Sequence, residues 1–126
     1  MMGLLQRLFG GRQEEAEQQV DVLAEAQARV RQQPDDPEAH FDLGSIYYVR
    51  EHFEEAVNEL ERAVELAPDH GDANYMLGLA YAKLGRNEDA RRAFQTASEK
   101  ADNPMLQNYA QQKLKELTAS VEEVPD

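Results

Sequence analysis

The chain repeats itself at a fixed spacing of 34 positions. When the sequence is shifted by 34 positions, residues 37–70 fall on residues 71–104, and nine of the 34 aligned positions are identical. The identical pairs are Ala39/Ala73, Leu43/Leu77, Gly44/Gly78, Tyr47/Tyr81, Glu54/Glu88, Ala56/Ala90, Ala63/Ala97, Glu65/Glu99 and Ala67/Ala101. A fixed period of this length is typical of folds that stack one small supersecondary unit on copies of itself. It therefore restricts the possible folds more than any other feature of the sequence.

The matched positions follow the spacing of two helices in each unit. One face of a first helix collects residues spaced i, i+1 and i+4, namely Leu43, Gly44 and Tyr47. One face of a second helix collects residues spaced i, i+4 and i+7, namely Ala56, Leu60 and Ala63. Side chains at these spacings share one side of an α-helix. Each unit is therefore predicted to be a helical hairpin whose small residues allow close packing.

Helix-capping residues and prolines agree with this division. Asp36-Pro37 predicts a helix start, because Asp is a favoured N-cap and Pro a favoured first residue. Asn103-Pro104 predicts the start of a further helix, and Pro68 closes the second helix of the first unit. Gly85 lies where a first helix ends, and glycine tolerates the left-handed conformation found there. The first unit has Glu51 at that position, so we expect its turn to be tighter or less regular.

These residues carry a family resemblance. The segments H40-x-x-L43-G44-x-x-Y47-x8-A56-x3-L60-x2-A63-x4-P68 and N74-x-x-L77-G78-x-x-Y81-x8-A90-x3-F94-x2-A97 resemble the tetratricopeptide repeat. The match spans two full units, 37–70 and 71–104. It departs from the family pattern at His40 and Asn74, which replace the usual Trp, and at Asp102, which replaces the closing Pro. The resemblance implies an all-α fold, an α-α superhelix.

The flanks extend the array to about six antiparallel helices. Pro34 precedes Pro68 by one full period, so a helix over 13–33 takes the place of a second helix, although Arg29 stands where the pattern has Ala. A helix over 104–118 is striped by Leu106, Tyr109, Ala110, Leu114 and Leu117, and its polar back is typical of a capping helix. The predicted domain is therefore 13–118, followed by a disordered acidic tail, 119–126.

Composition excludes several classes of protein. The net charge of −12 argues against nucleic-acid binding, which needs Lys and Arg to neutralise phosphates. The absence of cysteine excludes a disulfide scaffold, a thiolate metal site and a cysteine nucleophile. Together with the lack of a secretory signal, it predicts a cytoplasmic location.

Residues 1–12 differ from the rest of the chain. They hold the apolar side chains Leu4, Leu5, Leu8 and Phe9 with two arginines and no acid. So short a helix needs a partner surface in water, so the segment is predicted to be mobile or docked. It could dip into an anionic membrane surface as a peripheral contact. Alternatively, residues 1–9 could dock into a groove of the same chain or of a second copy, giving a homo-oligomer.

The resemblance also implies where a partner would bind. In this family the first helices line a concave groove that takes a peptide or a helix. The corresponding positions here are Glu38, Phe41, Asp42, Ser45, Tyr48, Asp72, Tyr75, Met76, Leu79, Ala82 and Lys83, to which the capping helix could add Tyr109 and Lys113. Exposed aromatic side chains are favoured in protein interfaces. The prediction is a non-catalytic adaptor that prefers an apolar peptide with basic flanks.

One family subtype grips an acidic chaperone tail with Lys, Arg and Asn. The positions that would form that clamp hold no base here, namely Phe41, Asp42, Ser45, Asp72 and Met76. Acids at such positions repel an acidic tail, so the clamp is predicted to be absent.

Catalysis and cofactor binding find no support in the sequence. The many carboxylates follow exposed helix positions, which is typical of a solvated face. His40, His52 and His70 lack metal-ligand spacing, and no nucleotide-binding or hydrolase motif occurs. We therefore expect neither an enzyme nor a bound cofactor or metal.

Overall fold

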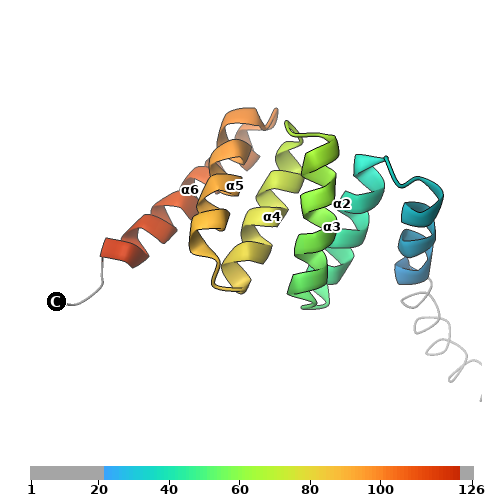
Figure 1. Ribbon diagram of the computed structural model, residues 1–126. Helices are drawn as coiled ribbons and strands as arrows, with labels where there is room; N and C mark the ends of the chain where they lie inside the picture. The colour runs from blue at the N-terminus through green and yellow to red at the C-terminus, as the bar shows by residue number, and fades with distance from the viewer. Residues whose placement is uncertain (1–21, 123–126) are drawn as a thin grey trace, which may run out of the picture.

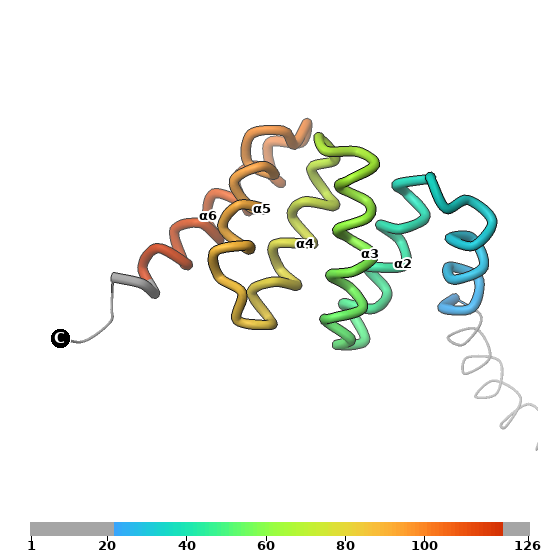
Figure 2. The backbone as a smooth tube through the Cα atoms, in the orientation of Figure 1, coloured from blue at the N-terminus to red at the C-terminus, as the bar shows by residue number. Residues whose placement is uncertain are grey.

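The computed structural model describes residues 22–122, with side chains described as far as residue 119, and this part is all-α. Residues 22–32 are helical, and five further helices follow: α2 (Pro37–Val49), α3 (Phe53–Leu66), α4 (Gly71–Lys83), α5 (Asn87–Lys100) and α6 (Pro104–Glu122). Figure 1 shows them side by side in chain order, and Figure 2 traces the same path as a tube. The prediction of an all-α chain is confirmed.

The helices form two layers. α2 packs on α3 and α4 on α5, so each predicted repeat is one hairpin. In the first-helix layer α4 contacts both α2 and α6, whereas in the described part of the chain α3 and α5 do not touch each other. A stack whose first helices lie closer together than its second helices curves toward the first-helix layer. We call the surface of α2, α4 and α6 on that side the inner face.

Each hairpin closes around one glycine of its first helix. Leu60 and Phe94 are fully buried at equivalent positions of α3 and α5. A Cβ atom at Gly44 would lie 2.6 Å from Leu60, and one at Gly78 would lie 2.6 Å from the Phe94 ring. The Leu-Gly pair of the repeat is therefore a steric requirement, because the large residue of the second helix occupies the space that a side chain would need.

The two hairpin turns share one geometry. Gly85 has φ 75° and Glu51, 34 positions earlier, has φ 63°, so both adopt the left-handed conformation. Equivalent backbone bonds close both turns: the N–H groups of residues 50, 51 and 52 donate to carbonyls 46, 48 and 47, and those of 84, 85 and 86 to carbonyls 80, 82 and 81. The prediction of a tighter or less regular first turn is wrong. The bonded frame around Glu51 holds it in a conformation that the residue type disfavours.

The residues that replace the usual Trp tie each first helix to the preceding loop. His40 and Asn74 are only 7% and 5% exposed. The His40 Nε2 donates to the Pro34 carbonyl over 2.7 Å, and the Asn74 Nδ2 donates to the Pro68 carbonyl over 3.1 Å. Both departures from the family pattern thus tie the first helix to a backbone carbonyl of the loop before it.

The third unit begins one residue early. Asn103 caps α6, since its Oδ1 accepts from the Met105 N–H over 2.9 Å, and it follows the cap His70 by one position less than a full period. The Gln107 side chain donates to the Ala101 carbonyl over 2.6 Å, six residues back, as His40 and Asn74 do in their units. The period of the first two units therefore does not carry into α6.

Some predicted boundaries differ from the observed helices. α6 reaches Glu122, four residues beyond the predicted end at 118, and so includes the first half of the predicted tail 119–126. The helical residues 22–32 fall within the predicted helix 13–33. Residues 1–21 and 123–126 lie outside the described part. The predictions for the N-terminal segment, including Leu4, Leu5, Leu8 and Phe9, therefore have no structural counterpart here.

Candidate peptide-binding face

Three tyrosines lie in one neighbourhood of the inner face, one from each first helix. Burial is the main cause that raises the pKa of Tyr75 on α4; Lys113 opposes the rise, and Tyr48, Glu116 and Tyr109 add to it. Tyr48 of α2 and Tyr109 of α6 are therefore near enough to Tyr75 to interact with its charge, as are Lys113 and Glu116. We call Tyr48, Tyr75 and Tyr109 the tyrosine cluster.

The apolar side chains of the predicted groove serve the core as well. Five of them are half-buried and packed against the core, namely Phe41, Tyr48, Tyr75, Met76 and Leu79. The Tyr75 ring lies 5.6 Å from that of Phe94, and the Tyr48 ring lies 5.4 Å from that of Phe53. Rings anchored in this way lose little conformational freedom when a partner covers their outer edges. Tyr109 is the most open of the cluster, at 49% exposure.

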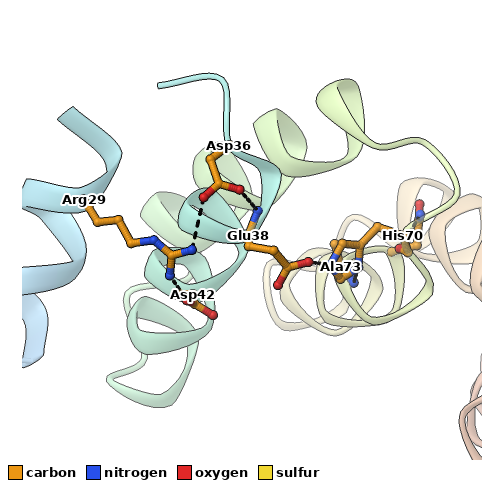
Figure 3. Close-up of polar contacts among 7 residues, drawn as sticks. Arg29, Asp36, Glu38, Asp42, His70 and Ala73 are labelled. Atoms are coloured by element: carbon orange, nitrogen blue, oxygen red, sulfur yellow. Dashed lines mark hydrogen bonds and ion pairs between the residues drawn. The ribbon is translucent and has the colours of Figure 1, made fainter. Parts of the chain in front are cut away.

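His70 connects α2 to α4 on the inner face. Its Nδ1 accepts from the Ala73 N–H over 3.0 Å, so the proton sits on Nε2, which donates to the Glu38 carboxylate over 2.5 Å (Figure 3). The Phe41 ring lies 5.0 Å from the His70 ring. The sequence placed His70 in a turn without a role. Its position one full period after the N-cap Asp36 is the signal that it also caps a helix.

Arg29 forms an ion pair with Asp42, one of the acids predicted to line the groove. Its guanidinium donates to Asp42 over 2.7 Å and to Asp36 over 3.1 Å, joining helix 22–32 to α2 (Figure 3). Asp42 is therefore already paired, and among the predicted acids of α2 and α4 only Asp72 is exposed with no ion pair to a described residue. The repeat pattern has Ala at position 29, so it gives no hint of this bridge.

The predicted residues do not all converge. Asp72 and Lys83 are exposed at opposite ends of α4, about 16 Å apart along the helix axis. Phe41, Asp42 and Ser45 line a cleft of about 460 Å³ between helix 22–32 and α2. A neighbouring cleft of about 480 Å³ brings in Ile46 and Val49 of α2, which the sequence analysis did not single out. The predicted groove thus divides into the tyrosine cluster and a separate N-terminal opening.

Two searches of the described residues for special sites were negative. Among residues 22–119 no three His, Asp or Glu side chains lie close enough together to hold a metal ion. No helix in that part of the chain has both the length and the apolar character needed to cross a membrane.

Stacked antiparallel hairpins, with a Gly on each first helix against a large residue on the second, define an α-α solenoid of helical repeats. A family model described as "Tetratricopeptide repeat" matches residues 41–104, just over half of the chain. The chain belongs to the tetratricopeptide-repeat family, as predicted. A search of curated proteins finds no match.

Two solved structures share the fold. The first tetratricopeptide repeat of Spaghetti (RPAP3), bound to the HSP90 peptide SRMEEVD, superposes with a TM-score of 0.76 at 18% identity, covering 95% of this chain and 93% of that one. MamA superposes with a TM-score of 0.56 at 24% identity, covering 83% of this chain and 70% of that one. At these identities the likeness establishes the solenoid fold alone.

Proposed function

We propose that the chain is a non-catalytic adaptor that binds a peptide or a helix of a partner protein on the inner face. The observation that carries the proposal is the tyrosine cluster, because α2, α4 and α6 each place an incompletely buried tyrosine in the neighbourhood of Tyr75. Tyrosine is favoured at interface hot spots, since it buries a large area and keeps a polar end. The Spaghetti (RPAP3) domain, which has a similar fold, binds a peptide.

The partner is expected to be apolar with basic flanks. The chain carries a net charge of −12, and Asp72 is exposed on α4 with no ion pair to a described residue. Glu116 of α6 is also exposed, but Lys113 pairs with it. Glu38 and Asp42 contribute less to recognition, because His70 and Arg29 already pair with them. An acidic peptide such as SRMEEVD is expected to bind poorly, because the clamp positions carry no base.

A random-peptide display library panned against the full chain tests this proposal. Selected peptides should contain aromatic or aliphatic residues beside Lys or Arg, and Tyr109→Ser should weaken them about tenfold, or about 1.4 kcal/mol. Arg92→Ala changes an exposed residue of α5, away from the inner face, and serves as the control. Selected peptides that bind Tyr109→Ser and the parent chain equally would show that the tyrosine cluster is not the site.

Two predictions from the sequence stay predictions. Recruitment to an anionic membrane surface through residues 1–12 concerns a segment outside the described chain, and a cytoplasmic location rests on composition alone.

A further inference from the structure

The N-terminal half-unit exposes positions that the later units bury. Val22 is 49% exposed, whereas Ala56 and Ala90, which lie 34 and 68 positions later, are completely buried. In the later hairpins this position of the second helix is covered by its own first helix. The helix over 22–32 has no such neighbour among the described residues.

The facing side of α2 shows the same difference. Ile46 is half-buried, whereas its equivalent on α4, Ala80, is completely buried. α4 is covered on its N-terminal side by α2 and α3, whereas among the described residues α2 has only helix 22–32 on that side. The uncovered position is therefore the one that a first helix preceding α2 would fill.

An apolar opening marks this position. The two clefts between helix 22–32 and α2 measure about 460 and 480 Å³ and share Val22, Ser45 and Ile46. The Ser45 Oγ is buried and has no hydrogen-bond partner in the part of the chain that the structure describes. The rim of the first cleft carries Glu25 together with the ion pair of Arg29 and Asp42.

The start of the chain carries the sequence of the missing helix. Extending the period backward places residues 3–15 on α2 (37–49) and α4 (71–83). Three core positions then align, namely Leu5 with Ala39 and Ala73, Phe9 with Leu43 and Leu77, and Gly10 with Gly44 and Gly78, whereas Arg12 and Gln13 fall on the buried Ala80 and Tyr81. Gly10 would face Ala26, the equivalent of Leu60, so the larger side chain shifts from the second helix to Phe9 on the first. The total bulk between the two helices is kept.

The connecting residues have the required length. In the two observed hairpins three residues, 50–52 and 84–86, separate the first helix from the second. The corresponding residues near the start are 16–18, and Glu17 falls on the left-handed position. Glu51 adopts that conformation in the first repeat with φ 63°, so a glutamate satisfies this turn in the same chain.

Charge agrees with the same placement. Residues 1–12 carry Arg7 and Arg12 and no acid. Arg7 lies 34 positions before Phe41, whose ring faces the cap His70, so by equivalence Arg7 would face the cap Asp36. Glu14 and Glu15 balance the two arginines within residues 3–15, so the favourable charge contact is confined to the Arg7 end of the segment.

We propose that residues 3–15 form the first helix of an N-terminal repeat, which covers the opening between helix 22–32 and α2 within the same molecule. The occupied surface adjoins the tyrosine cluster without including it, so this inference does not depend on the proposed function. It also gives the apolar side chains Leu5 and Phe9 a destination inside the domain.

Thiol protection tests the proposal, because the chain has no cysteine of its own. Ile46→Cys in the full chain should react with a maleimide nearly as slowly as Ala80→Cys, the buried equivalent. Adding Leu5→Asp with Phe9→Asp should raise the rate at residue 46 about tenfold by opening the covering helix, and leave residue 80 protected. Lys83→Cys, exposed on α4, should react fast in both backgrounds.

Three results would overturn the proposal. One is a thiol at residue 46 that reacts as fast in the parent background as with Leu5→Asp and Phe9→Asp. Another is protection that grows with protein concentration, which would make a second copy the occupant. If the aspartates also expose residue 80, the milder Arg7→Glu is measured instead; it should raise the rate at residue 46 alone, and no change there is the third overturning result.

Discussion

The two complete repeats agree in their cores and differ on their inner faces. The core keeps identical residues, as in Leu43/Leu77 and Ala56/Ala90. The turns share a backbone conformation but not a residue type, since Glu51 and Gly85 are both left-handed. At the inner-face positions Ser45 is replaced by Leu79, and neither residue identity nor charge is repeated at Asp42 and its equivalent, Met76.

The comparison separates the positions at which the fold restricts the residue type from those at which it does not. Packing a first helix against a second fixes the residue type, because the interior has no spare volume. Closing a turn fixes only φ and ψ, which several residue types can reach at different cost. The inner face is under neither constraint, so its composition is available for recognition. Three sets of substitutions test whether the two repeats tolerate change in this order.

Gly78→Ala should lower the free energy of unfolding more than Gly44→Ala does. A Cβ at residue 78 would lie within 3 Å of three atoms of the Phe94 ring, which is fully buried and cannot move aside. The overpacking costs about 3 kcal/mol, offset by about 1 kcal/mol of helix propensity. At residue 44 the Cβ would lie 2.6 Å from Leu60 Cγ and 3.3 Å from the Ala56 carbonyl oxygen; Leu60 is buried too, but an aliphatic side chain adjusts more easily than a ring, so the net cost should be lower, about 1 kcal/mol. Urea unfolding measures both, and equal costs would contradict the distinction.

Loss of the side-chain tie to the preceding loop should come next. Asn74→Ala removes the buried side chain that donates to the Pro68 carbonyl and should lower the free energy of unfolding by about 1.5 kcal/mol. His40→Asn supplies the donor that the second repeat uses, so it should be milder than His40→Ala. Thermal unfolding of the three variants decides this. If His40→Asn were as damaging as His40→Ala, the bond to Pro34 would not be the important contact.

Substitutions in the two turns should change the stability least, and their effects should have opposite signs. Gly85→Ala puts a Cβ on a residue at φ 75° and should destabilise by about 1 kcal/mol. Glu51→Gly relieves the same strain at φ 63° and should stabilise by less than about 1 kcal/mol, because glycine also increases the entropy of the unfolded chain. Denaturation midpoints compared at constant slope give both values. Destabilisation by Glu51→Gly would show that the glutamate is not strained.

The hairpins and the family could be predicted because core packing restricts the residue type at positions that recur every 34 residues. Leu60 and Phe94 pack against the matched glycines, and this packing does not depend on which residues lie on the surface. Features that depend on a partner in space escaped prediction. In the sequence Arg29 only departs from the repeat pattern, whereas in the structure it forms ion pairs with Asp36 and Asp42.

Partial burial was also beyond the sequence. A side chain such as Tyr75 lies on the boundary between core and inner face, and the spacing that marks a face does not say how deeply a ring sinks into it. The early start of α6 did not escape, because Asn103-Pro104 marks it in the sequence.

That early start has a consequence for lengthening the array. A copy of one full repeat inserted before His70 would begin in phase with its neighbours and could be added again without limit. After Asn103 the same cassette would follow a connection of three residues, 101–103, in place of the four, 67–70, that precede α4. Growth of the solenoid by duplication would therefore keep the repeat spacing before His70 and shorten it after Asn103.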